Sequence, residues 1–85
     1  MYYIYILQSS KDKKLYIGYS QDYLIRLGQH NEGLVKSTRH RRPFTLLYIE
    51  GYQEKKLATK REKSLKQFGA AYKRLTERIH ISDSI

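Results

Sequence analysis

The sequence of 85 residues contains no cysteine and no apolar run of membrane-spanning length. Without cysteine, neither a disulfide nor a thiolate-bound metal ion can hold the fold together. A membrane-spanning helix needs about 20 consecutive apolar residues, and no segment of this chain comes near that length. Met1 leads directly into the alternating YYIYIL, without the basic segment and cleavage pattern of a signal peptide. We therefore expect one soluble domain without a membrane partner, located in the cytoplasm.

Acidic residues are scarce as well. The chain has 17 Lys and Arg against 8 Asp and Glu, which gives a net charge of +9 and a pI near 9.9. Such an excess on a small domain is typical of proteins that bind a polyanion, so nucleic acid is the expected partner. A basic surface without any such partner is the alternative. No helix combines a broad apolar face with a basic one, so a membrane surface is less well supported.

Hydrophobic alternation and helical spacing predict six elements. These are strands over 2–8 and 14–20 joined by the polar turn SSKDK, a helix over 23–31, a strand over 44–52, and helices over 53–68 and 70–80. Ser20 or Asp22 can cap the first helix, and Gly33 can end it. The order β-β-α-β-α-α predicts an α+β fold, a single domain over 1–85 in which helices flank a small three-stranded antiparallel sheet.

The apolar positions also predict which side chains face the core. Along the first strand, Tyr3, Tyr5 and Leu7 share one face, and Ile4 and Ile6 share the other. The helix expected over 23–31 has the apolar stripe Tyr23, Leu24 and Leu27. The stripe of the helix expected over 53–68 is Leu57, Ala58, Leu65 and Phe68. The segment between, over 34–43, is expected to be a loop or a short irregular turn.

The segment KKLYIGYS raises a local question, because a glycine weakens the interior of a strand and often marks a close approach. Strand alternation places Tyr16 and Gly18 on one face. If Tyr5 shares that face, two hydroxyl groups lie side by side above a surface cleared by the glycine. A strand tyrosine most often serves for packing, so on this pattern alone packing and function both remain open for Tyr16.

Arg26 and His30 are four residues apart and project from one side of the first expected helix. An arginine and a histidine do not form an ion pair with each other, so helix stabilisation does not explain them. A shared anionic target and two unrelated surface residues are equally compatible with the spacing.

Glu62 lies beside the apolar stripe of the helix expected over 53–68. A carboxylate there is unusual unless it is paired or binds a metal ion. Lys66, one turn later, offers an ordinary helix ion pair as the alternative. Arg61 lies even nearer the centre of the stripe, which predicts a buried acidic partner for it.

The metal-binding residue types allow only a simple site. His30, His40 and His80 fall in separate elements, so zinc is not expected. No two acids are placed to hold two metal ions together. One Mg²⁺ or Mn²⁺ ion, bound by a single carboxylate, waters and a substrate phosphate, is the site that this sequence can offer.

Together these residues resemble the GIY-YIG nucleases. YIY at Tyr3–Tyr5 corresponds to the first half of the family motif, with Tyr3 where the family name has glycine, and YIG at Tyr16–Gly18 corresponds to the second half. The family's helix with an arginine and a His/Tyr position corresponds to DYLIRLGQHNEG, which contains Arg26 and His30. Its third strand corresponds to RRPFTLLYIE, and its helix with the acidic metal ligand corresponds to ATKREKSLK, which contains Glu62. The resemblance covers roughly 2–68 and is greatest to the small single-domain members.

The resemblance implies a metal-dependent endonuclease in which water attacks a phosphodiester in line, with DNA as the first expected substrate and RNA as the second. In this mechanism Tyr16, or His30 acting with it, would remove the proton from water. Arg26 would stabilise charge on the phosphate, and Tyr5 would orient water or phosphate. Glu62 would bind the metal ion. A free tyrosine has a pKa near 10 and needs a nearby cation or His30 to act as a base. Gly18 would leave space for a phosphate or water beside the hydroxyl groups.

Contacts with the nucleic-acid backbone are expected from the basic loop over 34–43 and from the helix over 53–68. The residues are Lys36, Arg39, His40, Arg41, Arg42, Arg61 and Lys66. A domain of this size has little surface for reading bases. A branched, damaged or single-stranded substrate, or a separate targeting protein, is therefore expected as readily as a specific sequence.

Two other functions stay open. Several characterised family members carry an asparagine about three helical turns beyond the acidic residue, whereas this region reads KRLTERI and the only asparagine is Asn31. That departure favours a nucleic-acid-binding module of the same fold without catalysis. A basic protein-interaction or ribosome-associated domain is the third candidate, and it predicts no convergence of Tyr5, Tyr16, Arg26, His30 and Glu62.

Overall fold

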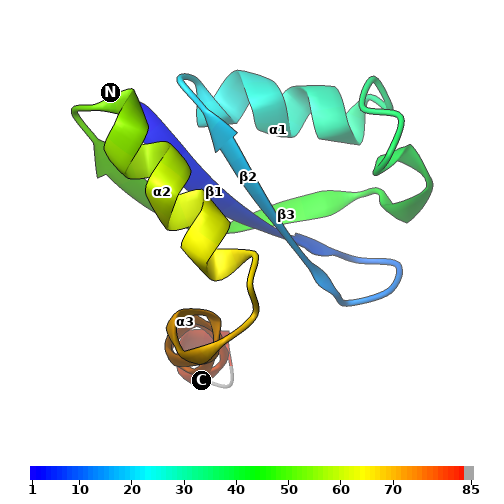
Figure 1. Ribbon diagram of the computed structural model, residues 1–85. Coiled ribbons are helices and arrows are strands. Elements are labelled where there is room, and N and C mark those ends of the chain that lie inside the picture. Colours follow the sequence, from blue (N-terminus) through cyan, green and yellow to red (C-terminus); the bar gives the residue numbers. More distant parts are fainter. Residues whose placement is uncertain (84–85) are drawn as a thin grey trace.

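A three-stranded antiparallel sheet organises the computed structural model, which describes residues 1–83 (Figure 1). The strands are β1 (Tyr2–Ser9), β2 (Leu15–Ser20) and β3 (Phe44–Tyr52), in the spatial order β2-β1-β3. Both pairings with β1 are antiparallel. The helices follow in the predicted chain order β-β-α-β-α-α, so the α+β prediction is confirmed.

The central strand β1 is buried on both faces, which divides the core into two clusters. Ile4 and Ile6 contribute to the larger cluster, whereas Tyr5 and Leu7 contribute to the smaller one. The larger cluster is completed by Ile17 of β2 and by Ala58, Leu65, Leu75 and Ile79 from helices α2 (Lys55–Leu65) and α3 (Ala70–Asp83). The predicted alternation of side chains along β1 is confirmed.

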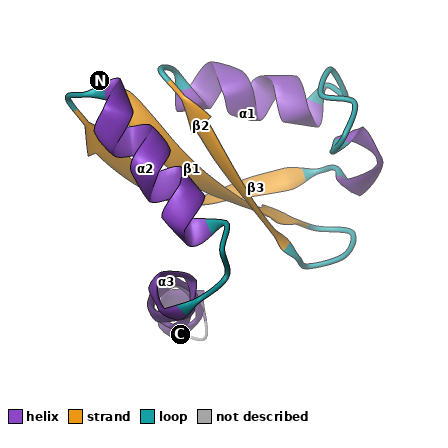
Figure 2. Ribbon diagram, in the orientation of Figure 1, coloured by secondary structure: helices purple, strands orange, loops and turns teal. Residues whose placement is uncertain are grey.

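The smaller cluster joins the opposite face of the sheet to helix α1 (Tyr23–Asn31). Tyr23 and Leu27 pack against it, and Tyr3 meets Tyr23 edge to face at 4.9 Å between ring centroids. Figure 2 shows α1 and α2 on either side of β2, with α3 seen along its axis. Residues from α1 therefore approach one face of the sheet, and those from α2 approach the other.

Helix α1 begins and ends as its sequence predicts. The Asp22 carboxylate accepts a hydrogen bond from the Ile25 backbone N–H at 3.1 Å, and Gly33 adopts φ +80° just after the helix. The prediction that Leu24 belongs to the apolar stripe is wrong, because this side chain is 62% exposed. At helical spacing Tyr23, Leu27 and His30 share the inward face, and Leu24 lies about a quarter turn away from it.

Helix α2 is shorter than predicted. It ends at Leu65, and Phe68 has φ +57° and is 65% exposed, so Phe68 lies in the turn rather than on the helix. Leu57 is 45% exposed, since Ala58 and Leu65, seven residues apart, take the inward face. The last helix, by contrast, starts at Ala70 as predicted and continues to Asp83.

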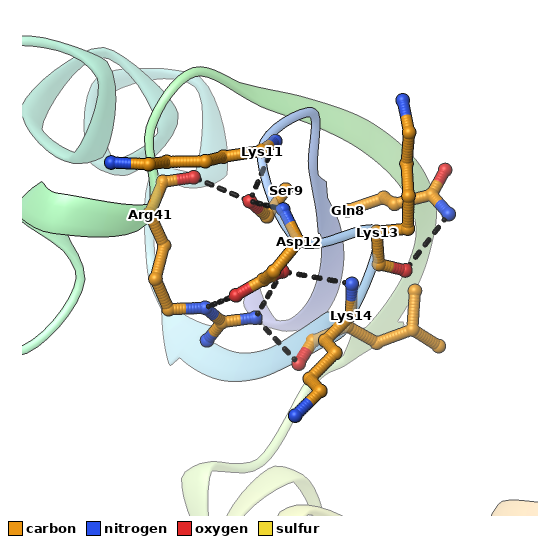
Figure 3. Close-up of polar contacts among 8 residues, drawn as sticks. Gln8, Ser9, Lys11, Asp12, Lys13, Lys14 and Arg41 are labelled. Carbon is orange, nitrogen blue, oxygen red and sulfur yellow. Dashed lines mark hydrogen bonds and ion pairs between the residues drawn. The ribbon is translucent and has the colours of Figure 1, made fainter.

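The basic loop between α1 and β3 is attached to the β1–β2 hairpin (Figure 3). The Ser9 hydroxyl donates to the Arg41 carbonyl, and the Arg41 guanidinium forms an ion pair with Asp12 at 2.7 Å. At the other end, Asn31 Oδ1 accepts from the Phe44 N–H at 2.6 Å and Nδ2 donates to the Phe44 carbonyl at 3.1 Å. The loop contains one short 3₁₀ turn, Arg39–Arg41.

Within residues 1–83, no helix has both the length and the apolar character to cross a bilayer.

Candidate active site

The site begins with the pairing of Tyr5 and Gly18 across β1 and β2. A Cβ atom placed on Gly18 would lie 2.2 Å from Tyr5 Cζ and 2.3 Å from its hydroxyl oxygen. The ring of Tyr5 therefore lies directly over the glycine. The prediction that Gly18 leaves space for a phosphate or water is wrong, because the aromatic ring fills that space.

His30 closes the inner side of the site and has no exposed surface. Its Nε2 atom lies 3.1 Å from the Tyr5 hydroxyl, and its Nδ1 atom lies 2.7 Å from Thr38 Oγ1. The Thr38 hydroxyl can donate onward to the Val35 carbonyl at 3.5 Å. With Nδ1 protonated and Nε2 accepting from Tyr5, both ring nitrogens of a neutral His30 are satisfied.

Burial and charge fix the protonation of this pair. Burial, with a smaller contribution from the Arg26 charge, lowers the pKa of His30 from 6.5 to about 4. Burial is also the main reason that the pKa of Tyr5 rises from 10.0 to about 12. At neutral pH the imidazole is therefore uncharged, and the Tyr5 hydroxyl keeps its proton.

Neighbouring groups also act on the pKa of Tyr5. A hydrogen bond and the charge of Arg26 lower the pKa, while Tyr16 and Glu62 raise it electrostatically. The Tyr16 ring lies 4.9 Å from the His30 ring and 6.3 Å from the Tyr5 ring, centroid to centroid. The structure thus brings Tyr5, Tyr16 and His30 together, and Arg26 and Glu62 lie near enough to Tyr5 to influence its pKa.

The five differ in their access to solvent. Tyr5 and His30 are buried, whereas Tyr16, Arg26 and Glu62 are half-buried. Only these three can therefore touch a ligand without rearrangement of the core.

Arg26 is the one cation among the five. Its guanidinium donates to Gln29 Oε1 at 2.9 Å, and among residues 1–79, whose side chains the structure describes, it has no carboxylate partner. A half-buried guanidinium next to a neutral histidine and a protonated tyrosine is poorly neutralised by the protein itself. An anionic ligand such as a phosphate would complete it.

Glu62 is the only carboxylate of the site. Its side chain is 23% exposed and forms an ion pair with Lys66 at 3.1 Å, the helix pair that the spacing allows. Oxygen donors of this kind suit a hard divalent cation. Within the described residues no cluster of three or more His, Cys, Asp or Glu could hold a metal ion, so waters and a substrate would have to complete the coordination.

Three of the predicted nucleic-acid contacts, Arg41, Arg61 and Lys66, form ion pairs within the protein. Arg61 forms an ion pair with Glu50 at 2.8 Å, and the Glu50 side chain is only 13% exposed. The prediction of a buried acidic partner for Arg61 is thereby confirmed. Arg41 pairs with Asp12 and lies 5.6 Å from the centre of the Phe44 ring. The remaining predicted contacts lie on the surface: Lys36, Arg39, His40 and Arg42.

Thr38 and Gln29 belong to the site but escaped the sequence analysis. Thr38 lies eight residues beyond His30 in an irregular loop, so no helical or strand periodicity connects the two. Gln29 is three residues after Arg26 on the same helix, and this spacing is the one signal that could have found it.

The chain is similar to known proteins over most of its length. Residues 1–75 match the GIY-YIG catalytic domain. The chain is 44% identical over 68 residues to the UPF0213 protein SSP2268 of Staphylococcus saprophyticus, and 41% identical to a UPF0213 protein of Staphylococcus aureus strain Mu3. Each match spans 79% of this chain and 82% of the relative. The solution NMR structure of the UPF0213 protein BH0048 from Bacillus halodurans superimposes with a TM-score of 0.57 at 31% identity, covering 93% of this chain and 85% of that one.

Proposed function

Since this chain belongs to the GIY-YIG family, we propose that it is an endonuclease that hydrolyses phosphodiester bonds of nucleic acid, DNA in the first place, with one divalent cation. The observation that carries the proposal is Arg26, a half-buried guanidinium without a carboxylate partner among residues 1–79, near Tyr5 and His30. A planar cation in such a place suits the charge that develops on a phosphate during in-line attack.

We assign the removal of the proton from the attacking water to Tyr16 rather than to His30. Both nitrogens of His30 are engaged and the ring is fully buried, so water cannot reach it in this conformation. Tyr16 is half-buried and lies against the histidine ring.

Tyr5 and His30 then serve as positioning residues. Hydrogen bonds join the Tyr5 hydroxyl to His30 and His30 to Thr38, so this chain of hydrogen bonds holds both rings behind Tyr16. In this role Tyr5 orients the histidine rather than a water or phosphate, because it is only 1% exposed.

Glu62 would hold the metal ion, Mg²⁺ or Mn²⁺, against the substrate. When bound, the ion stabilises negative charge on the leaving oxygen. Lys66 neutralises Glu62 in its absence, so the cation and the ammonium group compete for one carboxylate. The exposed loop residues Lys36, Arg39 and Arg42 would contact the phosphate backbone on either side of the site.

Plasmid nicking in the presence of Mg²⁺ tests the proposal, with Arg26→Ala and Glu62→Gln as the site variants. The matched controls are Arg74→Ala and Glu77→Gln, which remove the same charges at exposed positions of α3. We expect each site variant to lose at least about a hundredfold in rate, the scale of one lost transition-state contact, and each control to cut like wild type. Cutting by both site variants at the wild-type rate would contradict the proposal.

The second candidate is a nucleic-acid-binding module that does not cut. The Glu62–Lys66 ion pair favours it, because it provides the carboxylate with a structural role that needs no metal. Such a module would bind DNA with a steep salt dependence. It would leave the DNA uncut with or without Mg²⁺, and Glu62→Gln would make no difference to that. Absence of any cut product in a panel of DNA and RNA substrates would favour this candidate.

A further inference from the structure

An apolar groove runs along the outer edge of β2, next to the candidate active site. It has a volume of about 360 Å³ and is lined by Leu15, Tyr16, Ile17, Lys66, Phe68 and Tyr72. β2 is an edge strand, and Phe68 and Tyr72 reach it from the turn between α2 and α3 and from the start of α3. Five of the six lining residues are apolar or aromatic, and the sixth is a lysine.

The groove is continuous with the site through two shared residues. Tyr16 lines the groove and also packs against His30, while Lys66 lines it and also pairs with Glu62. A nucleotide whose phosphate lies at Arg26 and Glu62 therefore has this groove within reach of its neighbouring bases. The lysine at the margin matches the negative charge of a nucleic-acid backbone.

Phe68 is held in the groove at a conformational cost. Its φ of +57° lies in the left-handed region that bulky L-residues rarely adopt. The following residue, Gly69, would tolerate that conformation freely, yet the phenylalanine adopts it. The ring meets Tyr72 edge to face at 4.9 Å and remains 65% exposed. The turn after α2 therefore holds an exposed aromatic ring at the groove instead of burying it in the core.

We propose that this groove binds an unpaired nucleobase, which stacks on Phe68 while the adjacent phosphate lies in the active site. The proposal rests on the nuclease function above and names its substrate class, a nucleic acid with a single-stranded or locally opened segment beside the cut. A base inside an intact duplex has both faces covered by its neighbours, whereas an unpaired base can offer one face to a protein ring.

Binding measured in EDTA tests this without any cutting. The probes are a short labelled single-stranded oligonucleotide, its blunt duplex, and the same strand carrying 2-aminopurine, a base analogue whose fluorescence is quenched by stacking. We expect wild type to prefer the single strand and to quench the analogue. Phe68→Ala should weaken single-strand binding roughly tenfold, which corresponds to about 1.4 kcal/mol and lies within the range for one stacked base.

Further variants separate stacking from folding. Phe68→Trp should keep the affinity, and Leu34→Ala, which removes a side chain that is 68% exposed outside the groove, should not change it. Phe68→Gly should bind as weakly as Phe68→Ala, yet unfold roughly 4–8 °C higher than Phe68→Ala, since glycine tolerates the left-handed backbone. Binding that follows the melting temperature instead of the ring would contradict stacking.

The result that overturns the inference is distinct from failure of the nuclease proposal. If Phe68→Ala binds the single strand as wild type does, or if wild type leaves 2-aminopurine unquenched, the groove does not bind a base, and an apolar peptide becomes its better candidate. The nicking assays with Arg26→Ala and Glu62→Gln are unaffected by that outcome. Wild type that cuts plasmid but fails the stacking test would retain the nuclease function and lose only the base site.

Discussion

Replacing Gly18 by alanine is expected to destabilise the fold, because the added methyl group would overlap the ring of Tyr5. The new Cβ would lie 2.2 Å from Tyr5 Cζ, whereas ordinary contacts begin at 3.4 Å, so the ring or strand must move by 1.2 Å. Tyr5 is only 1% exposed and its hydroxyl is bonded to His30 at 3.1 Å. A displacement of this size cannot be absorbed without disturbing that hydrogen bond.

The cost of Gly18→Ala combines two effects. Overpacking of a well-packed core costs about 1–3 kcal/mol, and a lost neutral hydrogen bond costs about 0.5–1.5 kcal/mol. Together they predict a loss of about 2–4 kcal/mol, a large part of the roughly 4–13 kcal/mol expected for a domain of this length. The melting temperature should fall by at least about 8 °C.

Urea unfolding followed by circular dichroism measures this effect. Gly28→Ala is the matched control, because no atom lies within 4 Å of a Cβ there and the position is inside α1, so alanine should stabilise by about 0.5–1 kcal/mol. A double-mutant cycle isolates the cause. In a Tyr5→Leu background, Gly18→Ala should cost far less than in wild type. An unchanged unfolding midpoint for Gly18→Ala, or the same cost in both backgrounds, would refute the steric reasoning.

Three further predictions concern charge. Glu50→Gln should lower the free energy of unfolding by about 2–3 kcal/mol at pH 7, less than the loss of a fully buried pair because Arg61 is 31% exposed. Burial raises the pKa of Glu50, but hydrogen bonds from Arg61 and the neighbouring tyrosines lower it further, so the net shift is downward. The stability difference between wild type and variant in urea unfolding should therefore shrink as the pH falls below the ordinary value of 4.5, and a difference that grows there would contradict the prediction. His30, with a pKa of about 4, should stay neutral at pH 5.5 in an NMR titration of the folded protein. The free energy of unfolding should fall as the pH drops from 6.5 toward 4, because only the unfolded chain then gains this proton. Titration of His30 near 6.5 in the folded protein would contradict this. Lys66→Ala should tighten Mn²⁺ binding, measured by electron paramagnetic resonance, roughly two- to fivefold by removing the competitor of Glu62, whereas unchanged affinity would place the ion elsewhere.

Much of the fold could be predicted from the sequence because its causes are local. Alternation of apolar residues is set by the geometry of a strand, so the two faces of β1 were assigned correctly. The Asp22 cap and the Gly33 stop depend on residues within one helical turn of the helix ends. The prediction for Leu24 failed because this residue lies off the inward face of α1, and that for Phe68 failed because α2 ends at Leu65.

The candidate site shows the same division. The identities of Tyr16, Arg26 and Glu62 came from motifs whose order is visible in the chain, and the position of Arg61 predicted that a buried acid exists. That this acid is Glu50 could not be read from the sequence, because the pair joins β3 to α2 through the packing of a helix on a sheet. Thr38 was missed for the same reason, since a loop returns it to His30.

The sequence by itself determined the α+β order, the basic charge and the family motif, because each depends on residue type and spacing along the chain. The tertiary structure decided what Gly18 accommodates, which side chains of the site reach solvent, and where Phe68 lies. These features depend on strand register and on contacts between residues distant in sequence. They arise only when the sheet, its two cores and the turn after α2 are assembled together.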